Sequence, residues 1–459
     1  MILKNFEDII NPTLDIWKKI GYKNISAKNK YNTIINNKKL IHKFDDDLDN
    51  FVLNAINYYD NLNSFVIFGK NKDDAYRYYL DEFNNNYTLY GIKYLKVKFN
   101  LIHKILYQLL FARMIIKNKN DITNHLEEEL SFLNEYDKEF IDITILFVCK
   151  RDLNKKYPDN DIINNNFYIY IPNTKESIWN CASLFFCNSS LEFIEKQNFD
   201  YFLIKEMDKS KKMFLKYRKW LNMNVPYKDQ PSFLVFSSTI LYLLGHRAIN
   251  DVDLYIHTIS DQLIEKTNDL KNNEEYKFIE FNIKNTENWP LYWDTWLDEW
   301  AQKCDAKYFE EFLGNPKYHF YFLGVKILSL NCDIVRRLHR NRPRAVADLI
   351  ALRKRYFLKI DIPSIPEKVT KYISTSELSQ VEIENMVNSG GILNEQYKEI
   401  AISEPSNIDK FINTIIFALQ TRYKMVFTVD EIKRELNMYT DTSKSKKIKV
   451  IVNRKDPSK

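Results

Sequence analysis

The chain has 459 residues, of which 45% are hydrophobic and 28% charged, a composition typical of globular protein with two or three domains. Its formal net charge of +6 permits a polyanionic partner but does not require one. The cysteines and histidines show no zinc-ligand spacing, and the eight glycines form neither a Gly-x-Gly-x-x-Gly motif nor a P-loop. These patterns argue against a zinc domain, a Rossmann dehydrogenase, a P-loop NTPase and a protein kinase.

The cysteines and the apolar stretches indicate the compartment. Five cysteines, an odd number, favour reduced thiols in an intracellular protein. The start, MILKNFEDII, lacks a secretory signal pattern, and the longest apolar stretches are too short or too charged to span a membrane. We therefore expect a cytoplasmic protein without a membrane partner. The abundance of Asn, Lys, Ile and Tyr suggests an AT-rich genome, either that of a protist or that of a large DNA virus acting in the host cytoplasm.

Residues 1–165 are predicted to form a mixed α/β region of unknown role. Apolar patterns predict strands at 64–70, 89–100 and 140–150, and helices at 73–83 and 101–117. No catalytic constellation is evident in this region.

Residues 166–230 are predicted to be a helical connector. Helical spacing is expected at 175–197 and again at 201–223. The second helix carries six basic residues among aromatic ones, namely Lys209, Lys211, Lys212, Lys216, Arg218 and Lys219. Two interpretations stay open, a solvated helix face and a face that contacts RNA or phosphate.

Residues 231–360 are predicted to form an α/β (α+β) domain with a central mixed sheet. Strands are expected at 233–237, 251–257, 276–283 and within 318–330, and helices at 238–244, 260–273, 291–313, 331–340 and 345–356. Residues 361–459 are predicted to be a mostly helical region that ends in a basic tail.

Two carboxylates interrupt an otherwise apolar strand, because Asp251 and Asp253 stand two residues apart in DVDLYI. Such side chains project from the same face, so their charges repel unless a cation lies between them. Carboxylate oxygens suit Mg²⁺ or Mn²⁺, which would complete its shell with substrate phosphates and water. Taken alone, the pair also fits a solvated strand edge.

The residues before this pair have features of an anion site. Ser237 and Ser238 lie where a strand is expected to turn into a helix, whose free amides attract phosphate. Arg247 could supply a further phosphate contact. The complete order of strand, small residues, helix, Gly-x-Arg and Asp-x-Asp favours a nucleotide site over a solvated edge.

This order resembles the nucleotidyltransferase superfamily, which includes DNA polymerase beta and poly(A) polymerases, and is most similar to its minimal and AbiEii-type members. The family pattern of Gly-Gly/Ser, Thr-x-Leu, Gly-x-Arg and Asp-x-Asp is matched by Ser237-Ser238, Thr239-Ile240-Leu241, Gly245-His246-Arg247 and Asp251-Val252-Asp253. The resemblance covers roughly residues 231–360. It implies a nucleotidyltransferase-like sheet that binds the nucleotide through Ser237, Ser238, Thr239 and Arg247.

A second stretch, residues 324–352, is similar to a family segment in which a cationic helix precedes Arg-Pro-x-Asp and an Asp-Leu pair. The matching residues are Arg337, Arg342, Pro343, Asp348 and Leu349. The resemblance implies that Arg337 and Arg342 face the nucleotide while Asp348 orients an arginine. A basic surface helix with its own ion pair is the other interpretation.

The family's third carboxylate, on a later strand, has two candidate positions here. Glu280 is our choice, because its strand, YKFIEFNI, has the correct alternation. In the other strand, FLGVKIL, the position is Lys326, which we assign to nucleotide binding. Asp251, Asp253 and Glu280 are thus the predicted catalytic residues, and the third acid would activate the acceptor hydroxyl.

These features predict a metal-dependent nucleotidyltransferase, with Asp251 and Asp253 as metal ligands. It would transfer a nucleoside monophosphate from an NTP to a hydroxyl of RNA, protein or a small molecule. Two alternatives stay open. One is a catalytically degenerate nucleotidyltransferase fold that binds nucleic acid or acts as a scaffold, and the other is a poly(A) polymerase.

Overall fold

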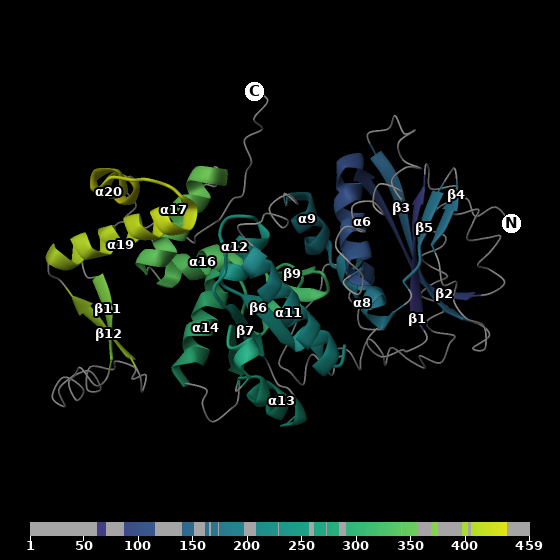
Figure 1. Ribbon diagram of the computed structural model, residues 1–459, viewed down its shortest axis with the longest axis horizontal. Helices are drawn as coiled ribbons and strands as arrows, with labels where there is room; N and C mark the ends of the chain where they lie inside the picture. Colours follow the sequence, from purple (N-terminus) through teal and green to yellow (C-terminus); the bar gives the residue numbers. More distant parts are fainter. Residues whose placement is uncertain are drawn as a thin grey trace.

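The computed structural model describes residues 62–69, 87–114, 140–150, 161–164, 167–172, 174–196, 208–227, 229–256, 261–271, 273–283, 291–340, 342–356, 369–374, 397–402 and 405–437. Within these ranges the chain is a mixed α+β protein, with helices around two five-stranded sheets and a separate two-stranded sheet (Figure 1). The helix expected at 73–83 and the basic tail lie outside the described residues. No described helix is both long and apolar enough to cross a membrane.

The N-terminal sheet is antiparallel throughout and has the strand order β2-β3-β1-β5-β4. Its strands are β1 (Leu62–Gly69), β2 (Tyr87–Lys98), β3 (Phe140–Lys150), β4 (Ile162–Asn164) and β5 (Phe167–Tyr170). Alternate residues, such as Val66 and Phe68, enter a core to which α6 (Phe99–Met114) contributes. β5 lies beyond the boundary expected at residue 165, because it pairs with β1 instead of starting the connector.

The central sheet is mixed and has the strand order β8-β7-β6-β10-β9. Its strands are β6 (Phe233–Phe236), β7 (Val252–Ile256), β8 (Ile279–Ile283), β9 (His319–Phe322) and β10 (Val325–Leu328). β7 runs parallel to β8 and β6 to β10, whereas β6–β7 and β9–β10 are antiparallel. β6 is buried on both faces, since Val235 packs in one hydrophobic cluster and Leu234 in another.

Two helices join the sheets. The single helix expected at 175–197 is divided into α8 (Lys175–Phe185) and α9 (Asn188–Lys196), because the chain leaves helical geometry after α8. The Trp179 ring of α8 donates from Nε1 to the carbonyl of Gly324, between β9 and β10, at 3.0 Å. A Cβ on Gly324, whose φ is +76°, would lie 3.1 Å from that ring. Glycine therefore permits the close contact between connector and central sheet.

The remaining helices around the central sheet are α11 (Asp208–Asn224), η4 (Gln230–Ser232), α12 (Ser238–Leu243), α13 (Asp261–Lys271), η5 (Glu274–Tyr276), α14 (Leu291–Lys303) and α15 (Glu311–Gly314). The tryptophan-rich helix expected to reach residue 313 thus ends ten residues earlier. Asp305 adopts φ 64°, and Ala306 N donates to Ala301 O at 3.0 Å. This left-handed C-terminal cap terminates α14.

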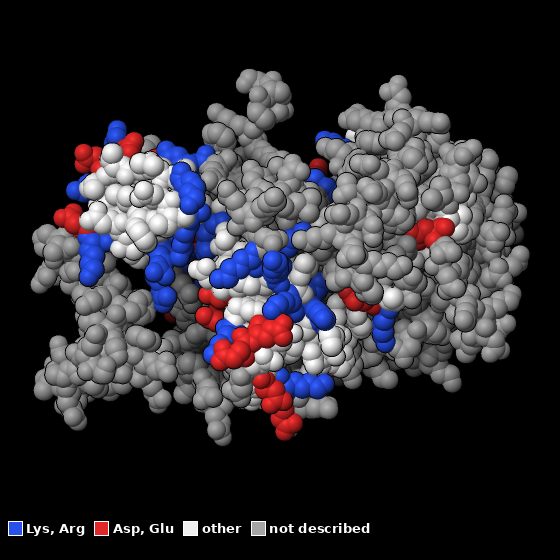
Figure 2. All heavy atoms as spheres, in the orientation of Figure 1, with Lys and Arg blue, Asp and Glu red and all other residues white. Residues whose placement is uncertain are grey.

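The basic residues of α11 are divided between the two sides of the helix. Lys211 and Arg218 are buried, and Arg218 pairs with Glu176. The exposed members are Lys209, Lys212, Lys216 and Lys219. Figure 2 shows Lys and Arg side chains gathered over the part of the molecule where Figure 1 places α11.

The C-terminal part contains α16 (Leu330–Arg340), α17 (Pro343–Tyr356), β11 (Val369–Ser374), β12 (Tyr397–Ile402), α19 (Pro405–Tyr423) and α20 (Val429–Asn437). α19 joins the main hydrophobic core through Ile412, Ile415 and Leu419. The antiparallel pair β11–β12 departs from the weakly helical expectation for residues 361–459. The β-branched and aromatic residues of β11, VTKYIS, favour a strand and explain the difference.

Candidate functional site

One edge of the central sheet collects the predicted carboxylates. β6 ends at this edge, and its neighbour β7 begins there because the two strands are antiparallel. β8 begins at the same edge because it runs parallel to β7. Asp253 stands directly beside Glu280 on β8 and beside Phe236 on β6. Residues that pair across a sheet project from the same face, so the register brings Glu280 to Asp253.

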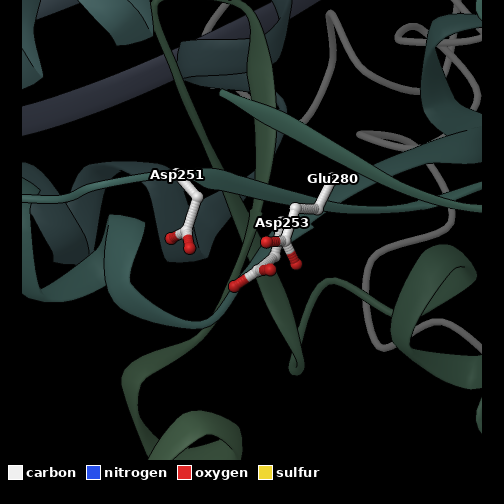
Figure 3. Close-up of side chains that lie close together, drawn as sticks. All are labelled: Asp251, Asp253 and Glu280. Atoms are coloured by element: carbon white, nitrogen blue, oxygen red, sulfur yellow. The ribbon is translucent and has the colours of Figure 1, made fainter. Parts of the chain in front are cut away.

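The three acidic side chains converge, although Asp251 lies one residue before β7. Carboxylate oxygens of Asp251, Asp253 and Glu280 all lie within 4.8 Å of one another. In Figure 3 the carboxylates of Asp253 and Glu280 lie together, with that of Asp251 beside them. Asp251 and Asp253 are half-buried and Glu280 is exposed.

The three carboxylates repel one another when they are ionised. Loss of solvent and the charges of Asp253 and Asp251 raise the pKa of Glu280 to about 7. Burial and the charge of Asp253 also raise the pKa of Asp251. A cation shared by the three groups would remove this repulsion. Three oxygen ligands on one sheet edge fit a hard divalent cation such as Mg²⁺ or Mn²⁺.

The turn between β6 and α12 lies at the same edge. Ser237 adopts φ 68°, a region that favours glycine, at the position where the family pattern has its first glycine. Its hydroxyl accepts from Arg336 Nη2 at 3.1 Å. Ser238 and Thr239, which follow on α12, are 4% and 0% exposed. Of these three residues, Ser237 is therefore the one open to a ligand.

The backbone of Ser237 leads to a prediction about stability. Ser237→Gly and Ser237→Ala both lack the hydroxyl, but only alanine keeps a Cβ at positive φ. We expect the alanine variant to be less stable than the glycine variant by about 1 kcal/mol or more. The strain of a Cβ at φ 68° and ψ −129° lowers the stability of the alanine variant, and the greater freedom of glycine in the unfolded chain offsets part of this difference. Urea unfolding of both variants measures the difference. Equal stability would show that this backbone is unstrained.

Beside this edge, the buried carboxylate of Asp348 in α17 pairs with several arginine side chains. Arg247 Nε lies 3.2 Å from its Oδ1, and Arg337 Nη1 pairs with its Oδ2. Two groups from α19 reach the same carboxylate: Arg422 Nη1 at 3.5 Å and the Tyr423 hydroxyl, which donates to it. Burial would raise the pKa of Asp348, but the charges of Arg337 and Arg247 and the Tyr423 hydroxyl hold it below its usual value.

A second buried acid, Asp333 of α16, extends this network to the Ser237 turn. Its Oδ1 accepts from Arg336 Nη2 at 2.8 Å, and its Oδ2 accepts from Arg337 Nε at 2.7 Å. Arg337 therefore bridges the two acids. Burial would lower the pKa of Arg337, but Asp333 and Asp348 raise it above its usual value.

The network contains residues that the sequence did not suggest. Asp333 and Arg336 could have been predicted as a pair, because an acid and a base three positions apart lie on the same face of a helix. Arg422 and Tyr423 carry no such signal, since they lie far along the chain from Asp348 and outside both motifs. Arg422 is the most exposed arginine of the network at 23%.

Two residues that were predicted to bind the nucleotide, Lys326 and Arg342, are not part of the arginine network. Lys326 is 4% exposed, and its ammonium group donates to the carbonyls of Pro231 and Leu313. These bonds anchor β10 to η4 and α15, so Lys326 has a structural role. Arg342 is exposed immediately before α17. Neither residue belongs to the group of three carboxylates or to the arginine network.

Comparison with known proteins identifies no relative. The chain matches no protein-family model, no curated protein and no solved structure.

Proposed function

We propose that the chain is a divalent-metal-dependent nucleotidyltransferase, which moves a nucleoside monophosphate from an NTP to a hydroxyl acceptor. The observation that carries the proposal is the meeting of Asp251, Asp253 and Glu280 within 4.8 Å at one sheet edge. The position of an Asp-x-Asp strand beside a strand with a third acid supports a nucleotidyltransferase-like arrangement, as the sequence resemblance implies.

The three acids would hold Mg²⁺ or Mn²⁺. When bound, the cation would neutralise charge that develops on the reacting oxygens. The acceptor oxygen would form a bond to the α-phosphorus of the NTP while the bond from that phosphorus to the β-phosphate oxygen breaks. Pyrophosphate would leave, and Glu280 would accept the hydroxyl proton. Asp251 and Asp253 would remain ionised ligands.

The arginine network gives the triphosphate a favourable environment. Among the residues that the structure describes, four guanidinium groups, those of Arg247, Arg336, Arg337 and Arg422, share the two carboxylates of Asp333 and Asp348. Two positive charges therefore lack a carboxylate within the network. Arg247 and Arg422 also act on Asp251, where their charges oppose the rise in its pKa. An anion at the carboxylate edge would lie within reach of this excess charge.

A transfer assay with two labels tests the proposal. Wild-type protein is incubated with Mg²⁺ or Mn²⁺ and each NTP, labelled at either the α- or the γ-phosphate, with RNA and protein acceptors offered separately. We expect the α-label on an acceptor and the γ-label in pyrophosphate. Transfer of the γ-label, or no metal-dependent transfer from any NTP, would contradict the proposal.

A further inference from the structure

A line of four lysines follows the outer face of α11. Lys209, Lys212, Lys216 and Lys219 are all exposed. Their separations of three and four residues put them in one row along the helix. Met213, Phe214, Tyr217 and Trp220, on the opposite side of the helix, enter the hydrophobic core. Packing therefore fixes which side of α11 faces solvent, and we refer to the row as the α11 lysine line.

Two contacts place this line beside the carboxylate edge. Ile249, just before Asp251, donates from its backbone N to Ser210 Oγ at 2.9 Å. Farther along α11, Lys216 Nζ pairs with Glu275 Oε1 at 3.0 Å. Glu275 lies in η5, which leads into β8 and Glu280. The line thus passes the segments that enter both strands of the candidate site.

Within α11 the basic residues outnumber the acidic ones, although Glu275 of η5 pairs with Lys216. The only acidic residue of this helix is Asp208, at its first position. Neighbouring lysines three or four residues apart repel one another and weaken a helix. A ligand with regularly repeated negative charges would relieve this repulsion. A phosphodiester backbone has such charges, whereas a small acceptor would engage only one or two of the lysines.

We propose that the α11 lysine line binds the phosphate backbone of a single-stranded nucleic acid whose terminal hydroxyl is the acceptor. The inference rests on the proposed function. The terminal oxygen would form the new bond to the α-phosphorus, its proton would pass to Glu280, and pyrophosphate would leave. The lysines take no part in this chemistry and would hold the strand beside the site.

Strand binding can be measured without catalysis. Fluorescence anisotropy of labelled single-stranded RNA and DNA, long enough to span α11, is recorded over a range of salt concentrations without NTP or metal. The variant Lys209→Gln/Lys212→Gln/Lys219→Gln should bind about tenfold or more weakly near physiological salt. Loss of three phosphate contacts should reduce the slope of log affinity against log salt by about 2. Comparison of RNA with DNA shows which strand is preferred.

Two controls separate this inference from general charge effects and from the proposed function. Lys307→Gln/Lys317→Gln/Lys410→Gln removes the same charge from other exposed positions and should bind like the wild type. Asp253→Asn should also retain strand binding, whether or not wild-type protein transfers nucleotide. Equal weakening in both triple variants, or no weakening in the first, would overturn the inference. Displacement of the strands by an acidic peptide that binds more tightly would overturn it in favour of a protein acceptor.

Discussion

Asp253→Asn should abolish nucleotide transfer, with a loss of about 10²-fold or more, while the fold is retained. Asparagine has nearly the same shape but removes one of three charges that would bind the cation. Effects of this size are typical when one electrostatic group is removed from a reacting site. Without metal, stability should hold or rise, because Asp253 repels both Asp251 and Glu280.

Transfer and metal-induced stabilisation should be lost together in this variant. Thermal unfolding with and without Mn²⁺ gives a binding readout that does not depend on turnover. Asp430→Asn removes the same charge from an exposed position on α20 and serves as the matched control. If Mn²⁺ raised the unfolding temperature of Asp253→Asn as much as that of the wild type, Asp253 would not be a metal ligand.

Asp348→Asn should destabilise the protein by about 3 kcal/mol or more. The carboxylate is 1% exposed and pairs with arginines from three parts of the chain. Neutralising it would leave buried guanidinium charges without their counterion, which is among the most costly single changes in a folded protein. Nucleotide transfer should also decrease, because Arg247 and Arg422 would lose the carboxylate that orients them.

Urea unfolding measures this effect. Asp269→Asn, at an exposed position on α13, should stay within about 0.5 kcal/mol of the wild type. The double variant Asp348→Asn/Arg422→Gln should lose less than the sum of its single variants, since one unpaired cation is removed. An Asp348→Asn protein as stable as the wild type would mean that solvent reaches the arginines.

The acidic part of the site could be predicted because it follows local rules. Asp251 and Asp253 were found from period-two spacing in an apolar strand, and Glu280 from the alternation of its own strand. Their convergence also required β8 to pair in parallel with β7, which the intervening helix α13 allows. The sequence pattern of each strand and the pairing of β7 with β8 therefore place the three acids at the same edge of the sheet.

The cationic part could be predicted only in pieces. Arg247 and Asp348 were named separately, but Arg422 and Tyr423 reach them through the packing of α19 on the core, which no spacing reveals. The surroundings of Lys326 could not be predicted either, because its ammonium group is buried against backbone carbonyls from two other parts of the chain. The end of α14 at Lys303 depended on a left-handed cap at Asp305, formed without glycine.

The most direct test is a crystal structure of wild-type protein with Mn²⁺ and a non-hydrolysable NTP, with anomalous scattering used to locate the metal. The expected result is a manganese peak coordinated by Asp251, Asp253 and Glu280, with a phosphate oxygen of the nucleotide in its shell. A nucleotide bound elsewhere, or manganese absent from these carboxylates in the presence of bound nucleotide, would contradict the nucleotidyltransferase proposal.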